Sequence, residues 1–364
     1  MGNARGAIMN KGRFFEDFQV GESIHHATPR TLSAGDVSLY IALTGSRFPL
    51  HCASTVAQQF GFPEMPVDDL LVFHIAFGKT VPDISFNAIA NLGYADVRFI
   101  EPVYVGDTLN TITEVIGLRE NSNGKSGIVY VRSVAYNQHQ VPVLSWIRWV
   151  MVRKSKLNAP APQAHIPELP SFVASTEFTL PAAPATLAPH STGDGNLWDD
   201  FHPGLRIDHP TGMTIDATDH TLATKLYQNT ARVHFDAHWM AQSPMQQRLM
   251  YGGHVISICR ALSYEGLANA VLIKAIHGGQ HTHPCFAGDT LYCWSEVLEQ
   301  NALPGRTDLG ALRLRLVGVK NIAPETLLSA TLEHAGKTSY RPEVVLDLDY
   351  SVLMPRRTAP STAT

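Results

Sequence analysis

Three side chains with chemical potential stand close together in the loop at residues 229–234. Asn229, Arg232 and His234 lie within six residues, directly after a segment with the apolar spacing of a helix. Because an imidazole titrates near neutral pH, His234 could take a proton from water and return it to a substrate. The amide of Asn229 could hold that water, although it cannot accept its proton as a carboxylate would. The loop therefore predicts acid–base chemistry centred on His234.

Each of these residues also has a structural interpretation. A loop histidine can serve only to donate a hydrogen bond to a backbone carbonyl, and an asparagine often ends a helix or forms a turn. Arg232 suits a free substrate carboxylate through bidentate pairing, yet it could equally form an ion pair on the surface or between domains. Spacing alone leaves both interpretations open for all three residues.

The next predicted helix begins at Gly252-Gly253. Its apolar residues recur at helical spacing, at Val255, Ile258, Cys259 and Leu262. A glycine lets a backbone N–H approach a substrate oxygen, and the start of a helix adds positive potential. A tight turn into the helix would require glycine as well. Gly252 is therefore a candidate for stabilising negative charge on a substrate oxygen.

The region around His234 has an earlier counterpart in the chain. His51 lies 183 residues before His234, and the same offset, or one of 182, recurs along much of the sequence. Matching blocks are residues 15–21 and 198–204, and the predicted strands 102–109 and 284–291. A shared offset across separate blocks indicates an internal duplication of one unit that contains a helix and an antiparallel sheet.

The two copies differ at the residues that could do chemistry. The first copy has Ser46 and Asp69 where the second has Asn229 and Gly252. A carboxylate at the start of a helix would repel an oxyanion. We therefore expect one working site, in the second copy, and interpret His51 as a relic or a core histidine.

The duplication predicts two domains, residues 1–155 and 196–364. Residues 156–195 between them are rich in proline and alanine, which is typical of an extended linker, and are numerous enough to cross the face of a domain. Each domain ends on a long predicted strand, Val143–Val152 and Val345–Met354. The offset between these strands is 202, so the second copy contains roughly twenty extra residues near 321–341.

Composition excludes several classes of function. Hydrophobic residues make up 45% of the 364 residues, charged residues 16%, and the net charge is −4, which argues against a nucleic-acid partner. The four cysteines form no C-x-x-C pair, and no apolar run approaches the ~20 residues of a membrane span. These features predict a cytoplasmic protein without membrane partners.

Three histidines near residue 280 invite a metal interpretation. His277, His281 and His283 have the spacing H-x3-H-x-H, and the last two would face the same side of a strand. No zinc signature fits this spacing. We interpret them as strand packing or as the lining of a pocket, and predict neither a metal nor a cofactor.

The layout resembles the MaoC-like hotdog hydratases and dehydratases. It has their histidine loop after a helix at residues 226–235, a glycine-led helix, and the G-D-T-L sequence at residues 106–109 and 288–291. The resemblance covers both copies. It implies an α+β double hotdog, in which two long helices are each wrapped by an antiparallel sheet and the two sheets are continuous. The first copy would be the degenerate hotdog and the second the catalytic one.

Within this family, residues 70–85 and 149–154 are most similar to enzymes that act on branched, carboxylated enoyl-CoA thioesters. The resemblance implies a hydro-lyase whose partner is an acyl-CoA thioester, with catalysis by His234, Asn229 and Gly252. It assigns substrate binding to Arg232, Gly253 and Tyr227. Formation of a homo-oligomer stays open.

The chain departs from the family pattern at the loop aspartate. Ser46 and Asn229 replace it in the two copies, and Ala231-Arg232 replaces the Asn-Pro of the loop. Three alternatives therefore stay open: an (R)-specific hydratase of another acyl chain, a non-catalytic acyl-CoA binding protein, and a hotdog thioesterase.

Overall fold

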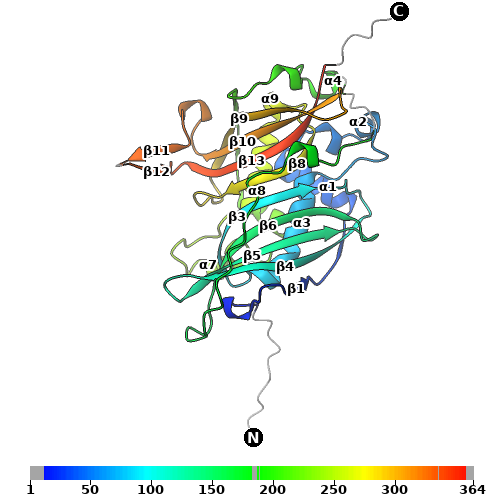
Figure 1. The fold of residues 1–364 in the computed structure, drawn as a ribbon. Coiled ribbons are helices and arrows are strands. Elements are labelled where there is room, and N and C mark those ends of the chain that lie inside the picture. The colour runs from blue at the N-terminus through cyan, green and yellow to red at the C-terminus, as the bar shows by residue number, and fades with distance from the viewer. Residues whose placement is uncertain (1–11, 183–186, 188, 335, 358–364) are drawn as a thin grey trace, which may run out of the picture.

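One continuous antiparallel sheet organises the molecule (Figure 1). The structure is a computed structural model and describes residues 12–182, 187, 189–334 and 336–357. The sheet has 11 strands in the order β1-β4-β5-β6-β3-β8-β13-β10-β9-β7, with β2 paired to β4. Its strands are β1 (Ser23–His25), β2 (Arg30–Thr31), β3 (Ala88–Phe99), β4 (Thr108–Glu120), β5 (Ser126–Tyr136), β6 (Pro142–Arg153), β7 (Arg206–Thr214), β8 (Leu272–Gln280), β9 (Thr290–Ala302), β10 (Leu309–Lys320) and β13 (Val344–Pro355).

The two halves of the chain meet where β3 pairs with β8. Tyr94 lies opposite Gly279, and Ala95 opposite Gly278, in an antiparallel register. Strands before the linker lie on one side of this seam and strands after it on the other (Figure 1). This arrangement confirms the predicted α+β fold class and the single sheet shared by both halves.

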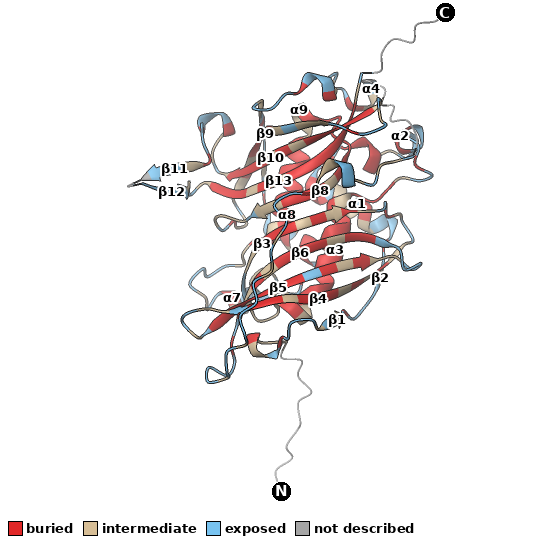
Figure 2. Cartoon of the chain, viewed as in Figure 1, coloured by how far each residue is buried: buried red, intermediate tan, exposed pale blue. Residues whose placement is uncertain are grey.

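Two central helices, α3 (Asp69–Thr80) and α8 (Gly252–Leu262), lie along one face of the sheet (Figure 1). Every residue of α3 after Asp69 is buried, because the segment is apolar almost all round. Figure 2 shows the burial concentrated in these helices and the strands that wrap them. The helices touch at their middles, where His74 Nε2 and Ser257 Oγ lie 2.8 Å apart.

The remaining helices are shorter and surround the central pair. They are α1 (Ala34–Thr44), α2 (Ser54–Gln59), α4 (Pro189–Thr192), α5 (Ala217–Leu226), α6 (Arg232–Phe235), α7 (Ala237–Met240) and α9 (Tyr264–Leu267). A π-helical turn, η3 (Val81–Ser85), extends α3, and short 3-10 turns are η1 (Phe15–Asp17), η2 (Pro49–His51), η4 (Ser175–Glu177), η5 (Trp198–Asp200) and η6 (Pro324–Thr326). Among the described residues, no helix has the length and apolar character needed to cross a bilayer.

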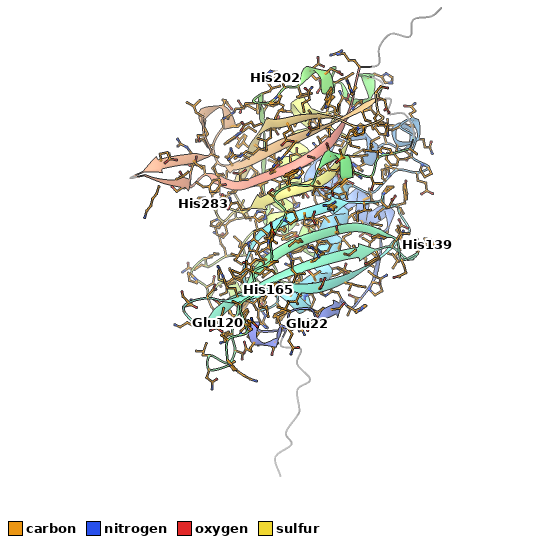
Figure 3. All side chains as sticks on the ribbon, viewed as in Figure 1. Glu22, Glu120, His139, His165, His202 and His283 are labelled. Carbon is orange, nitrogen blue, oxygen red and sulfur yellow. The ribbon has the colours of Figure 1, made fainter. Side chains whose placement is uncertain are left out.

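The segment between β6 and η5 crosses the outer face of the sheet (Figure 1). His165, labelled in Figure 3, forms an isolated bridge with Leu118 of β4, and the Val173 N–H donates to His277 Nδ1 at 2.9 Å. A Cβ on Gly117 would lie 2.6 Å from the His165 carbonyl oxygen, so glycine permits this close crossing. The described part of the segment includes η4 and α4. Residues 183–186 and 188 of the predicted linker lie outside the described part.

Two sequence predictions about strands were wrong. Residues 102–107 and 284–289 are loops, and β4 and β9 begin only at Thr108 and Thr290. Each loop turns at a glycine with positive φ, Gly106 at 100° and Gly288 at 97°, which a strand does not allow. The central strands β3 and β8 were not predicted. The extra residues near 321–341 form η6 and the hairpin of β11 (Thr331–His334) and β12 (Lys337–Tyr340), which stands off the main sheet.

Candidate active site

A cavity of 640 Å³ lies between the two halves. Its first wall comes from the end of α3, the start of β3 and the inner face of β6. Its second wall comes from α6, the N-terminus of α8 and the loop after β8. Four of the six residues assigned from the sequence line this one cavity: Asn229, Arg232, His234 and Gly252.

His234 lies in the short helix α6, and its ring is held from one side. Nδ1 lies 2.8 Å from the Leu249 carbonyl oxygen, which can only accept, so Nδ1 carries the proton. Burial lowers the pKa of His234 to about 4, although the hydrogen bond to Leu249 acts in the opposite direction. The ring is therefore neutral near pH 7, and its Nε2 has a free lone pair. His234 thus donates to a backbone carbonyl, as its structural interpretation required, and this hydrogen bond orients the ring as a base.

Asn229 is buried beside the cavity, with only 2% of its surface exposed. Its Oδ1 accepts from the Ala231 N–H at 3.2 Å, which forms the turn that leads into α6. Because the amide oxygen is engaged by this turn, the NH₂ group is the part that can hold a ligand. Asn229 can therefore form the turn through its Oδ1 and hold a ligand through its NH₂ group at the same time.

Helix α8 opens at the cavity without a side-chain cap. Its N-cap residue Tyr251 supplies no capping hydrogen bond, whereas Asp68, the equivalent residue of α3, accepts from the Leu70 N–H at 2.9 Å. Helix geometry leaves the N–H groups of a first turn without intrahelical acceptors. The N-terminus of α8 can therefore donate to an oxygen in the cavity and adds positive potential there.

The two glycines at this helix start allow close packing of neighbouring rings. A Cβ on Gly252 would overlap the His281 ring, which also lines the cavity. A Cβ on Gly253 would overlap the Tyr251 ring, and Gly253 itself is not among the residues that line the cavity. Gly253 therefore acts on the cavity only through Tyr251.

Tyr227, assigned to substrate binding from the sequence, lies behind the cavity wall and is not among its lining residues. Its side chain is fully buried, and its hydroxyl lies 3.2 Å from His254 Nδ1. Its ring packs against Tyr251 with 5.8 Å between centroids. A Cβ on Gly78 would overlap the Tyr227 carbonyl oxygen, so α3 approaches this turn very closely. Tyr227 supports the wall that Tyr251 forms.

Arg232 lies at the rim of the cavity. It is exposed, and its guanidinium stands 5.1 Å from the centre of the Phe86 ring, which belongs to the other half of the chain. Arg153 also lines this region and is exposed. The rim therefore carries two cations that solvent can reach.

Sequence reasoning missed Arg148 and Asn91 on the first wall and Tyr251 on the second. Arg148 is fully buried and lines the cavity, and Asn91 and Tyr251 place buried polar atoms there that have no hydrogen-bond partner among the described residues. His281, which the sequence allowed as a pocket-lining residue, lines the second wall. Burial lowers the pKa of Arg148 to about 10, so it stays charged near pH 7. Arg148 belongs to a strand with the ordinary alternation of residue types, so its sequence context does not mark it as a site residue. Only the fold brings it opposite His234.

The equivalent place in the first half is filled by the chain itself. His51 Nδ1 lies 3.1 Å from the Pro66 carbonyl oxygen, which matches the contact of His234 with Leu249. Asp69, in the position of Gly252, accepts from the Ile273 N–H at 2.8 Å and lies 4.0 Å from His51 Nε2. A carboxylate of the protein thus stands where a substrate oxygen would need to bind.

The three histidines near residue 280 do not form a common group. His277 is buried between Ser351 Oγ, at 2.7 Å, and the Val173 N–H, whereas His281 lies in the cavity wall. β8 ends at Gln280, so the expectation that His281 and His283 share a strand face was wrong; Figure 3 shows His283 where the chain leaves β8. Within the described ranges, no group of three or more His, Cys, Asp or Glu side chains could hold a metal.

Comparisons with known proteins bear on the whole chain. Residues 17–137 match the family described as MaoC like domain. The β-methylmalyl-CoA dehydratase of Chloroflexus aurantiacus is 54% identical over 96% of this chain and 99% of its own length. The mesaconyl-CoA hydratase of Cereibacter sphaeroides is 50% identical over 95% of this chain and 99% of its own length.

Solved structures agree with this similarity. A MaoC domain protein dehydratase from Chloroflexus aurantiacus superposes with a TM-score of 0.93 and 54% identity, over 97% of this chain and 100% of the other. A Mycobacterium tuberculosis protein described as a double hotdog fold superposes with a TM-score of 0.69 and 25% identity, over 95% and 99% of the two chains.

Proposed function

This chain belongs to the MaoC-like dehydratases, and from that premise we propose that it is a hydro-lyase that reversibly converts mesaconyl-CoA (2-methylfumaryl-CoA) to β-methylmalyl-CoA. The observation that carries the proposal is the convergence of a neutral, oriented His234, the Asn229 amide and the uncapped start of α8 on one cavity. Hydration of an enoyl thioester requires a base, a holder for water, and donors for the thioester oxygen.

We assign the proton transfers to His234. The Asn229 NH₂ group holds a water molecule, and His234 Nε2 takes its proton as the oxygen bonds to the β-carbon. The double-bond electrons move to the thioester oxygen, where the first N–H groups of α8 stabilise the enolate. The His234 imidazolium then returns its proton to the α-carbon. Because one residue removes and returns the proton on one face of the substrate, this assignment predicts syn addition.

The low pKa of His234 determines the form in which the ring enters the reaction. Since burial lowers that pKa to about 4, the ring is in its basic form near pH 7, and the imidazolium formed during the reaction readily gives up its proton. An amide in place of the family's loop aspartate cannot share this proton transfer. In this chain, His234 acts as both base and acid.

The first half of the chain contributes the acyl pocket. Phe77, Val81 and Tyr94 line the wall opposite His234, and the exposed Arg153 and Arg232 at the rim suit the phosphates of CoA. We place the thioester at the start of α8 and the acyl group between the halves.

A cytoplasmic location remains our proposal from the cysteine pattern. Light scattering would determine whether the chain forms a homo-oligomer.

The test is the ultraviolet absorbance of the enoyl thioester with mesaconyl-CoA as substrate. Wild type should remove this absorbance without releasing a free thiol, and His234→Ala should lower kcat by about 10²-fold or more, the usual effect of losing a general acid or base. His51→Ala is the matched control, because His51 makes the same carbonyl contact in the filled half. Circular dichroism and thermal melting would establish that both variants are folded.

The alternatives give different results in the same assay. Thiol release with mesaconyl-CoA would indicate a thioesterase, and tight binding without loss of absorbance would indicate a binding protein. Decay of crotonyl-CoA in preference to mesaconyl-CoA would keep the reaction and overturn the carboxylated substrate. Equal losses in His51→Ala and His234→Ala would contradict the assignment of one working half.

A further inference from the structure

Arg148 is a buried cation with few partners. Its Nη2 donates to Thr80 Oγ1 at 2.8 Å, and its guanidinium stands 4.2 Å from the centre of the Phe77 ring. Among the described residues, its Nε has no hydrogen-bond partner and no carboxylate lies within 4.0 Å of it. A guanidinium offers five N–H donors, and a buried charge is normally paired. Arg148 therefore has donors to spare inside the cavity.

The duplication supplies an internal comparison. β6 and β13 correspond at an offset of 202, which places Tyr350 at the position of Arg148. α3 and α8 correspond at an offset of 183, which places Arg260 at the position of Phe77. Each half thus has one buried arginine at this pair of positions, on the strand in the first half and on the helix in the second. The guanidinium of Arg260 stands 3.5 Å from the centre of the Phe48 ring.

The two buried arginines differ in how their charge is balanced. Burial lowers the pKa of Arg260, and the carboxylates of Asp68 and Asp69 act against that. For Arg148, only Tyr94 and Tyr251 oppose the effect of burial, and neither is ionised near pH 7. The filled site therefore holds carboxylates of the chain itself near Arg260, whereas in the described part of the chain none stands next to Arg148 in the open cavity.

A second polar side chain points to the same place. Asn91 of β3 pairs in register with Val150 of β6, so it is the diagonal neighbour of Arg148 on the same face of the sheet. Asn91 lines the cavity, and within the part of the chain that the structure describes neither the nitrogen nor the oxygen of its buried amide has a hydrogen-bond partner. The same holds for the Tyr251 hydroxyl on the facing wall.

We propose that Arg148 binds the free carboxylate of the substrate, with the Asn91 amide as a further donor, and so selects dicarboxylic over monocarboxylic acyl thioesters. This inference rests on the proposed hydratase function and names the residue that sets its substrate class. The sequence had suggested Arg232 for this task, but Arg232 is exposed at the rim, where water weakens an ion pair. Arg232 is left to the CoA portion.

The position of this carboxylate follows from the substrate. In mesaconyl-CoA the carboxylate is attached to the β-carbon, which is the atom that water attacks. A negative charge there repels the incoming oxygen, and pairing with Arg148 neutralises it. Pairing also fixes the β-carbon between Arg148 and His234. Arg148 thus determines specificity and positions the substrate, while His234 moves the proton.

The test compares mesaconyl-CoA with tiglyl-CoA, in which a methyl group replaces the carboxylate at the same carbon. We expect Arg148→Met to lower kcat/KM for mesaconyl-CoA by about 10²- to 10³-fold, since it removes one partner of a buried charge pair. The same variant should leave hydration of tiglyl-CoA unchanged or faster. A ratio of the two kcat/KM values equal to that of wild type would overturn the proposal.

Two further variants separate specificity from folding. Arg132→Met makes the same change on β5, where Arg132 is exposed and does not line the cavity, and should leave both substrates unaffected. Arg148→Lys keeps the charge but loses the bidentate fork, and should restore part of the preference for mesaconyl-CoA. An equal loss on both substrates in Arg148→Met and Arg148→Lys would make Arg148 a structural residue and overturn its role in specificity.

A binding measurement keeps this inference separate from the proposed function. Calorimetry in the His234→Ala background would give the Kd of mesaconyl-CoA and tiglyl-CoA without turnover. Tighter binding of mesaconyl-CoA that disappears in His234→Ala/Arg148→Met would support the carboxylate site even if wild type hydrated neither thioester, an outcome that overturns only the hydratase. Equal affinities for the two thioesters, or no binding of either, would overturn the carboxylate site.

Discussion

His74 and Ser257 occupy the same position in the two halves of the chain, and they are hydrogen-bonded to each other, Nε2 to Oγ, at 2.8 Å. They lie 183 residues apart, at the point where α3 and α8 touch. Burial lowers the pKa of His74 well below its usual value, so this contact is between neutral groups. The contact marks the centre of the internal symmetry, deep in the core and away from the cavity lining.

The first prediction concerns this contact. Ser257→Ala would leave His74 Nε2 and the Tyr40 hydroxyl, which donates to Ser257 Oγ at 3.0 Å, without that partner. We expect the free energy of unfolding to fall by about 1–3 kcal/mol, because a buried polar group loses its hydrogen bond. Urea denaturation measures this, with the exposed Ser171→Ala as control. Because Ser257 does not line the cavity, KM should stay within twofold, about 0.4 kcal/mol; a larger change would show that the central contact shapes the site.

The second prediction is a pH profile. The neutral ring of His234 is the active form, and its pKa of about 4 lies below the usual value, so the active form persists as pH falls. We expect kcat/KM for mesaconyl-CoA to be flat from about pH 8 to pH 5 and to decline only towards pH 4. An acid limb near pH 6.5 would show that His234 titrates as a solvated imidazole and would contradict its burial.

This profile requires a control for unfolding. Burial also lowers the pKa values of His209 and His254 to about 4. The unfolded chain takes up protons near pH 6.5, before the folded chain does, so these groups reduce stability as pH falls from about 6.5 to 4. Near-ultraviolet circular dichroism at each pH would separate loss of fold from protonation of His234.

The third prediction tests the close approach at the start of α8. Gly252→Ala adds a Cβ that overlaps the His281 ring and would push the ring into the cavity. We expect kcat/KM to fall by about 10²-fold, comparable to the loss of an oxyanion donor, while the fold is kept, because alanine favours a helix. Gly35→Ala, in the first turn of α1, meets only ordinary contacts and serves as control. Wild-type kinetics in Gly252→Ala would mean that the substrate does not approach this residue.

The fourth prediction is the number of sites. Since Asp69 fills the first half beside His51, calorimetry should find one acyl-CoA bound per chain. Asp69→Gly should add no second site, because Ser46 still stands where Asn229 is needed, and it should lower stability by about 1–3 kcal/mol, since the Ile273 N–H loses its acceptor. A stoichiometry of two in wild type would contradict the filled half.

Much of the architecture could be predicted from periodicity and repetition. The offset between His51 and His234 identified two copies, and the apolar spacing after Gly252 identified α8, because both are local patterns. β3 and β8 were not predicted, because their glycines and alanines obscure the alternation of apolar and polar residues that is typical of a strand. The same small residues allow the two strands to pair closely at the seam. The residues that permit this pairing are therefore the ones that make the strands hard to recognise in the sequence.

The site was predicted in part, for a related reason. The loop that holds Asn229 and His234 is continuous in sequence, so its residues could be associated before the fold was known. Arg148 and Asn91 belong to the other half and meet that loop only across the cavity. Tyr227 shows the opposite error: its place next to the loop suggested a ligand contact, but the turn at Gln228 directs it into the core.

The seam between β3 and β8 joins two walls that do not have to be identical. In an assembly of identical subunits related by a twofold axis, any substitution is made at both active sites at once. Here Arg148 could arise on one wall while its counterpart stayed Tyr350, and Asp69 could close one site while Gly252 kept the other open. When the two copies are joined in one polypeptide, each wall can therefore change independently of the other. Single mutations can then shape the cavity for an asymmetric substrate that has different groups at its two ends.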